Sequence, residues 1–194
     1  MAQASFASYA TAMAQWEEWQ QEYRFGVLLI YPPEPLRTRV NSLRALHDPR
    51  SQAYCDAHIS MTVPFPRPVT AEDWAALAAV GEQYAPVTVV YGPPRQYPGV
   101  PGVVLNIEPA EQLSKLVMAL ESLPVFAHAV ARRYPFSPHM TVAEFITLQR
   151  TEELLRELPA GELSGTFECS ELAYAVPDER FHFSATAFLA LNGR

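Results

Sequence analysis

The sequence carries the same short pattern twice, once in each half of the chain. In each copy a histidine is followed two positions later by a hydroxyl side chain: the first copy reads HISMTVPF over residues 58–65, and the second reads HMTVAEF over residues 139–145. A threonine stands twelve positions after each histidine, and we expect Thr70 and Thr151 to cap the helices that follow. A motif, a strand and a cap repeated in the same phase indicate a duplicated unit. The chain is therefore expected to fold as two matched halves around a shared cleft.

The apolar and β-branched residues of both copies predict strands. Because side chains alternate between the two faces of a strand, His58 and Ser60 share one face, and His139 and Thr141 share one face. If an approximate twofold axis relates the halves, both pairs converge on one site. The same alternation places Glu144 on the face opposite His139.

The rest of the sequence is predicted to form strands interleaved with helices. Hydrophobic residues make up 49% of the 194 positions and charged residues 18%, a balance typical of a globular protein. Expected strands run over residues 26–31, 57–65, 87–91, 103–107, 139–145, 163–176 and 181–191, and expected helices over residues 35–47, 70–84, 110–123, 124–133 and 151–158. This mixture predicts an α+β fold.

The first 24 residues differ from those that follow. Residues 5–24 contain no Gly or Pro and carry apolar side chains at helical spacing, so we expect an N-terminal amphipathic helix within residues 1–24. Residues 25–194 then form the single domain that holds both motifs. No signal peptide is recognised, and no apolar run approaches the ~20 residues of a membrane span. We therefore expect a cytoplasmic monomer with no membrane association.

The charge balance limits the possible substrates. The net charge is −7, from 14 basic and 21 acidic residues, which disfavours holding a long nucleic acid by charge alone. A small nucleotide or an RNA end is the better expectation. Lys115 is the only lysine and no nucleotidyl-lysine motif surrounds it, so ligation through a lysine adenylate is excluded.

The two motifs together supply groups suited to displacement at phosphorus without a metal ion or other cofactor. Imidazoles titrate near neutral pH, so one of His58 and His139 can act as a base while the other acts as an acid. The hydroxyls of Ser60 and Thr141 can donate hydrogen bonds to the non-bridging oxygens of a phosphate. Which histidine is the base depends on the orientation of the substrate, and both assignments stay open.

These residues resemble the paired H-x-[ST]-x motifs of the two-histidine (2H) phosphoesterase superfamily, which includes 2′-5′ RNA ligase-like proteins and cyclic nucleotide phosphodiesterases. The resemblance spans residues 25–191. It implies two pseudo-symmetric lobes of mainly antiparallel sheet, with helices on the outside and a central cleft. It also implies His58 and His139 as catalytic residues, Ser60 and Thr141 as phosphate ligands, and metal-independent hydrolysis of a cyclic phosphate or a 2′-5′ phosphodiester.

Four further residues are candidates for lining the substrate site. Tyr31, Phe65 and Tyr174 have flat rings that can stack on a base, although aromatic residues in strands more often belong to the core. Arg95 is expected in a loop over residues 92–102, where it can contact a phosphate from a mobile lid or remain solvated.

Two other classes of function compete with a phosphoesterase. A protein of the same fold can bind nucleotides or RNA ends without chemistry, although no basic and aromatic RNA-binding strand is present. A metal hydrolase can use His58 and His139 with an acid such as Glu144, and the expected placement of Glu144 on the opposite face counts against it.

Overall fold

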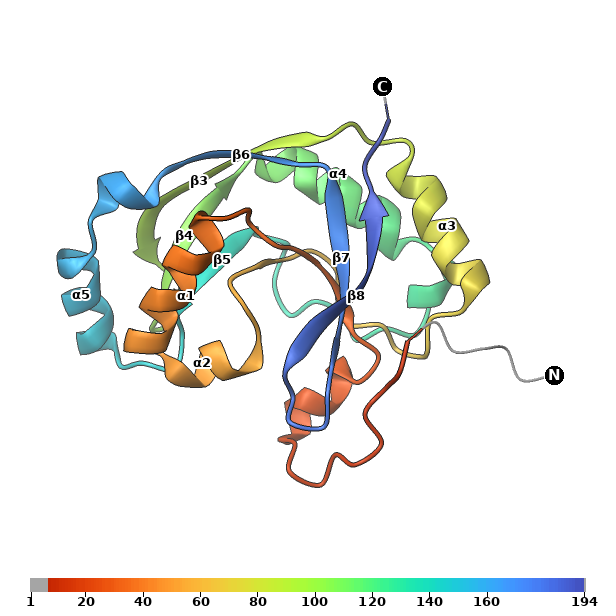
Figure 1. Cartoon of the computed structure of the whole chain (residues 1–194), viewed down its shortest axis with the longest axis horizontal. Helices are drawn as coiled ribbons and strands as arrows, with labels where there is room; N and C mark the ends of the chain where they lie inside the picture. Colours follow the sequence, from red (N-terminus) through yellow and green to blue (C-terminus); the bar gives the residue numbers. More distant parts are fainter. Residues whose placement is uncertain (1–6, 194) are drawn as a thin grey trace.

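A single eight-stranded sheet forms the centre of the molecule (Figure 1). The computed structural model describes residues 7–193. All paired strands are antiparallel, in the order β6-β3-β4-β5-β2-β1-β7-β8. The strands are β1 (Val27–Ile30), β2 (Ile59–Ser60), β3 (Val87–Gln96), β4 (Val103–Glu108), β5 (His139–Ala143), β6 (Gly165–Cys169), β7 (Glu171–Pro177) and β8 (Phe183–Ala190).

Helices lie between the strands in the sequence. The α-helices are α1 (Leu36–His47), α2 (Pro49–Tyr54), α3 (Ala71–Gly81), α4 (Ala110–Glu121) and α5 (Leu148–Glu157), and the 3₁₀ helices are η1 (Glu18–Tyr23), η2 (Pro124–Phe126) and η3 (Ala160–Leu163). No helix among residues 7–193 is both long enough and apolar enough to cross a lipid bilayer.

The strand order divides the sheet into two lobes of four strands. One lobe runs β2-β1-β7-β8 outward from the centre, and the other runs β5-β4-β3-β6. The lobes join where β2 pairs with β5, through Ile59 opposite Met140, which are the second residues of the two repeated motifs. The expected two-lobed sheet is therefore confirmed, with the two motifs at the seam between the lobes. The lobes are not the two halves of the sequence, because β7 and β8 from the end of the chain lie beside β1.

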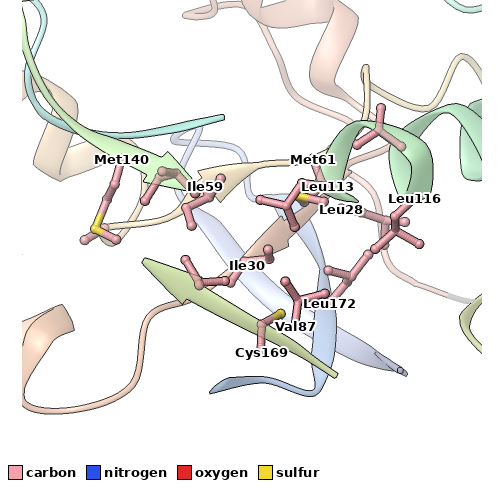
Figure 2. Close-up of a cluster of buried hydrophobic side chains, with 14 of the residues drawn as sticks. Leu28, Ile30, Ile59, Met61, Val87, Leu113, Leu116, Met140, Cys169 and Leu172 are labelled. Atoms are coloured by element: carbon pink, nitrogen blue, oxygen red, sulfur yellow. The ribbon is translucent and has the colours of Figure 1, made fainter. Parts of the chain in front are cut away.

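One face of the sheet carries the main hydrophobic core. Alternate residues of β1, such as Leu28 and Ile30, join this core together with side chains from α1, α3, α4 and α5. Figure 2 shows Ile59 and Met140 from the central strands in the same cluster as Leu113 of α4. The expected α+β fold with antiparallel lobes and outer helices is confirmed, and the opposite face of the sheet, here called the open face, is left for other contacts.

The helix caps follow the expected pattern in only one half. The hydroxyl of Thr70 accepts a hydrogen bond from the Asp73 amide at 3.1 Å, so Thr70 caps α3 as predicted. In the other half the prediction is wrong, because Thr147 caps α5. Thr151 lies buried inside that helix, where its hydroxyl accepts a hydrogen bond from the Gly102 amide at 2.9 Å.

The expected helix over residues 5–24 is wrong over most of its length, and residues 5 and 6 lie outside the described part of the chain. Only η1 is helical, and residues 7–17 follow an irregular path. This path lets the segment reach two separate regions, since Tyr9 packs against the main core while Ala10 and Trp16 join a second apolar cluster. Tertiary packing has overridden local helix propensity here.

Three smaller differences concern the ends of elements. Strand β3 continues to Gln96, past a bulge between Tyr91 and Pro94, so Arg95 lies in a strand and its expected place in a loop is wrong. Gly92 makes this bulge possible, because its φ of +82° disfavours other residues. Helix α2 was not predicted, and the expected helix over residues 124–133 is reduced to η2.

Candidate active site

The register between β2 and β5 arranges the two motifs as a square. Extending the antiparallel pairing of Ile59 with Met140 by one residue in each direction puts His58 beside Thr141 and Ser60 beside His139. Directly opposite side chains have Cβ atoms about 4.5–5.5 Å apart, and diagonal ones about 7–8 Å. The two histidines therefore occupy one diagonal of the square, with the two hydroxyls on the other.

All four side chains line one cavity of about 190 Å³ on the open face. Ser60 and His139 also line an adjoining cavity of about 430 Å³, whose far wall is formed by residues 130–137. The structure thus brings together the four residues that the motifs singled out. We call these four residues the quartet.

Both histidines are held in the same way. The ring nitrogen Nδ1 of His58 lies 2.6 Å from the carbonyl oxygen of Asp56, and Nδ1 of His139 lies 2.8 Å from that of Ser137. Because a carbonyl oxygen only accepts hydrogen bonds, each Nδ1 carries the proton in the neutral ring. Each Nε2 is then left as the acceptor.

The surroundings favour the neutral form of both rings. Burial, reinforced by the charge of Arg44, lowers the pKa of His58 to about 4. Burial also lowers the pKa of His139, with smaller contributions in the same direction from His58 and Arg95. Without a bound anion, both imidazoles are therefore unprotonated at neutral pH.

A buried arginine, Arg44, lines the quartet cavity and also holds the backbone of the second motif. Arg44 of α1 is 2% exposed, and its Nη1 donates to the carbonyl oxygen of Thr141 at 2.9 Å. Its Nη2 donates to the carbonyl oxygens of Ser51 and Cys55 at 2.8 and 3.0 Å. One guanidinium therefore ties α2 and the segment leading to β2 to the strand that carries His139.

The expected position of Glu144 is wrong. Its side chain lines the same cavity as His58 and His139, because β5 contains a bulge: Val103 and Val104 are adjacent, yet they pair with Ala143 and Thr141. The additional residue reverses the alternation that follows, so Glu144 turns to the open face.

Glu144 is already bound by protein groups. Ser51 Oγ donates to its carboxylate at 2.9 Å, and its backbone amide donates to Asp48 at 2.8 Å. Because Glu144 lines the same cavity as His58 and His139, strand alternation does not count against a metal site. Separately, no group of three or more His, Cys, Asp and Glu side chains within residues 7–193 is arranged to hold a metal ion.

Two of the expected lining residues belong to the core. Phe65 is fully buried and stacks on Phe126 at a centroid distance of 4.6 Å. Tyr174 is also fully buried, and its hydroxyl donates to the carbonyl oxygen of Phe25 at 2.7 Å. Neither ring reaches the cavity, so their expected place beside the substrate is wrong.

Neither Tyr31 nor Arg95 lines the quartet cavity or the larger cavity beside it. Tyr31 lines a separate groove, and its hydroxyl contacts Cys55 Sγ at 3.5 Å. Arg95 approaches the site from β3, where its Nε donates to Asn106 at 3.1 Å, and Asn106 pairs with His139.

Sequence reasoning missed three aromatic residues that face the site. The ring of Tyr97 lies 4.6 Å from that of His139, centroid to centroid, and lines the larger cavity. Trp19 and Tyr23, from the N-terminal segment, each line both cavities. A signal was available only for Tyr97, which lies in the same Gly- and Pro-rich stretch as Arg95.

Comparisons with known proteins agree with this architecture. The model of the 2′-5′ RNA ligase superfamily matches residues 32–180. No curated protein sequence matches the chain. Among solved structures, E. coli LigT complexed with 3′-AMP has a TM-score of 0.56 at 19% identity, covering 85% of this chain and 96% of LigT.

Two further solved structures share the fold. One is described as a phosphoesterase and has a TM-score of 0.56 at 20% identity, covering 85% of this chain and 96% of its own. The other, a protein from Thermus thermophilus, has a TM-score of 0.52 at 15% identity, covering 87% of this chain and 98% of its own. With the family match extending over most of the sequence and both motifs within it, the chain belongs to the 2′-5′ RNA ligase superfamily.

Proposed function

We propose that this protein is a metal-independent phosphoesterase that hydrolyses a cyclic phosphate, such as a 2′,3′-cyclic nucleotide, or a 2′-5′ phosphodiester. One observation carries the proposal: two histidines and two hydroxyls form a square in one cavity, and both histidines present Nε2 through the same Nδ1 hydrogen bond. That arrangement supports a mechanism in which a base and an acid act from opposite sides of one phosphorus atom.

The proposed reaction uses both histidines at once. Nε2 of His58 accepts a proton from water while the water oxygen forms a bond to phosphorus. The bond from phosphorus to one ribose oxygen breaks, and that oxygen takes a proton from Nε2 of His139. A cyclic phosphate becomes a phosphate monoester, and a second water returns the catalytic protons. We assign His58 as the base because its pKa is about 4, so it remains unprotonated at neutral and mildly acidic pH.

The hydroxyls and the surroundings assist in holding the phosphate. Ser60 and Thr141 donate hydrogen bonds to the non-bridging oxygens, where negative charge accumulates as water attacks. A bound phosphate raises the pKa of a nearby imidazole, which favours the protonated His139 that the acid role requires. The wall of residues 130–137 brings Arg132 and Arg133 to the larger cavity.

The related structures support a nucleotide as substrate. LigT of E. coli has been solved with 3′-AMP, with NADP⁺ and with ATP. The net charge of −7 in this chain points to a small nucleotide or an RNA end and away from a long nucleic acid.

Turnover of adenosine 2′,3′-cyclic phosphate, followed by chromatography with and without EDTA, tests the proposal. We expect conversion to an adenosine monophosphate at a rate that chelation does not change. Loss of activity in EDTA and its return with a divalent ion would establish a metal hydrolase. Tight nucleotide binding without any product, on cyclic and 2′-5′ substrates alike, would establish a binding protein.

The pH dependence should follow the two histidines. With His58 as base and His139 as acid, kcat/KM rises as His58 loses its proton near pH 4 and falls as His139 loses its own below its usual 6.5. We therefore expect a maximum at mildly acidic pH, measured between pH 3.5 and 8.5. A rate that stays constant from pH 6 to 8 would contradict these assignments.

Acid unfolding has to be separated from this profile. A histidine whose pKa is lowered by folding takes up a proton on unfolding, so stability falls as the pH drops from about 6.5 towards 4. Circular dichroism at each pH identifies where the protein remains folded, and rates outside that range are set aside.

A further inference from the structure

The N-terminal segment over residues 10–24 lies on the open face of the lobe that contains β1, whereas Tyr9 before it packs against the main core. Val27 and Leu29 of β1 point to this face and pack with Trp16, which is 7% exposed. Figure 1 shows the segment beside the tip of the β7–β8 hairpin. The family match covers residues 32–180, so this segment lies outside the matched region. We call it the N-terminal strap.

The strap is bound by side-chain contacts on both sides of the cleft. On the hairpin side, Trp16 Nε1 donates to the carbonyl oxygen of Glu179 at 3.0 Å. On the α2 side, Glu17 forms an ion pair with Arg50, whose guanidinium lies 4.0 Å from the ring centroid of Phe145. The strap therefore crosses from one lobe towards the elements that support the other.

Trp19 contacts residues on both sides of the cleft. Its ring lies 5.4 Å from that of Phe181, which takes a φ of +64°, and 6.2 Å from that of Tyr54. Its Nε1 donates to the Glu17 carboxylate at 2.8 Å. A bulky residue at positive φ persists only when its neighbours hold it there, and five aromatic rings surround Phe181.

The strap closes the quartet cavity on the side of β1. There the cavity ends against Trp19, Tyr23, Phe181 and Phe183, and its volume of about 190 Å³ is below the ~300 Å³ at which small-molecule sites begin. A whole nucleotide does not fit in it. The remainder of a substrate must extend into the adjoining cavity of about 430 Å³, which Trp19 and Tyr23 also line and which shares Ser60 and His139 with the quartet cavity.

The larger cavity carries charges of both signs. Glu22 lines the larger cavity from the strap, while Arg133 lines it from the opposite wall. A second backbone phosphate in this cavity is repelled beside Glu22 and attracted beside Arg133. A substrate that extends from the quartet into this cavity is therefore favoured along the wall of residues 130–137.

We propose that the N-terminal strap restricts this site to phosphates at the end of a substrate, such as a 2′,3′-cyclic phosphate on a mononucleotide or at an RNA terminus. A phosphodiester with nucleotides on both sides is excluded, because one flank would have to pass through Trp19 and Tyr23. This inference rests on the proposed function and selects between its two substrate classes.

Calorimetric titration with two probes tests the strap separately from turnover. Adenosine 3′-monophosphate carries a terminal phosphate, and a 2′-5′-linked adenosine trimer with free hydroxyl ends carries only internal ones. We expect the wild type to bind the monophosphate at least ten-fold more tightly than the trimer. In Trp19→Ala the trimer should gain at least five-fold relative to the monophosphate.

A second variant and a control complete the test. Glu17→Ala releases both Arg50 and Trp19 without removing a cavity side chain, and should shift the ratio in the same direction if Trp19→Ala fails to fold. Phe188→Ala removes an aromatic ring that is 56% exposed and outside both cavities, and should leave the ratio unchanged.

The outcomes distinguish the strap from the reaction. Equal affinity for both probes in the wild type, cleavage of the trimer, or an unchanged ratio in both strap variants overturns the strap proposal even if cyclic phosphates are hydrolysed. A clear preference for the monophosphate without any turnover supports the strap proposal and overturns the proposed reaction. Failure of both probes to bind overturns both.

Discussion

Replacing either His58 or His139 by alanine is expected to lower kcat for opening of a 2′,3′-cyclic nucleotide by about 10²–10⁴-fold, the contribution typical of one acid or base. The reason is geometric: each ring supplies one of the two proton transfers, and no other imidazole lines the cavity among residues 7–193. The double variant should be little slower than the single ones, because residues that act as a unit do not contribute additively.

The control for this prediction is His182→Ala. His182 is also followed two positions later by serine, and its Nδ1 also bonds to a carbonyl, that of Ala53 at 3.0 Å. It lies outside the quartet cavity, so its loss should leave kcat within two-fold of the wild type, a margin of about 0.4 kcal/mol. Full activity in His58→Ala or His139→Ala, with the fold verified, would end the proposed mechanism.

Arg44→Met is expected to reduce the free energy of unfolding by about 3 kcal/mol. The side chains are similar in length, but methionine removes the Arg44 donor from the carbonyl oxygens of Cys55 and Thr141 and one of two donors from that of Ser51. Each unsatisfied buried group costs about 1–3 kcal/mol. For a chain of this size, about 3 kcal/mol corresponds to a fall of about 6–12 °C in Tm. Denaturant unfolding and calorimetry measure both quantities.

Arg39→Met provides the comparison from the same helix. The Arg39 side chain is 50% exposed and pairs with Glu162 at 3.9 Å, so its loss should change the free energy of unfolding by less than about 1 kcal/mol. Equal losses for the two variants would show that the Arg44 hydrogen bonds do not stabilise the fold. Because Arg44 holds the carbonyl of Thr141, we also expect Arg44→Met to lower kcat while Arg39→Met does not.

The quartet could be predicted from sequence because strand alternation is local and both motifs lie in strands. The repeat also predicted the symmetry that joins them, and the structure places Ile59 opposite Met140 at the seam. Glu144 was misplaced because a bulge depends on the pairing of β5 with β4, which no local pattern reports. One additional residue in β5 therefore places the Glu144 carboxylate on the opposite face of the sheet from the one expected.

The prediction of a helix in the N-terminal segment was wrong for a different reason. Its composition and spacing favour a helix, and the helix is overridden by contacts with residues far along the chain, such as Glu179 with Trp16 and Tyr174 with Tyr9. Phe65 and Tyr174 show the converse problem. Aromatic residues in strands have the same appearance in the sequence whether they face a core or a ligand, and only the completed packing separates them.

The seam between the lobes has a consequence for the ancestry of this fold. Each lobe brings one histidine and one hydroxyl to the junction of β2 and β5, so half of the chain holds half of a site. Two identical half-chains related by a true twofold axis would bring two copies of one motif to the same junction. Such a homodimer already contains all four groups. Joining its subunits into one polypeptide would leave each copy free to diverge, which would account for the serine in one motif and the threonine in the other.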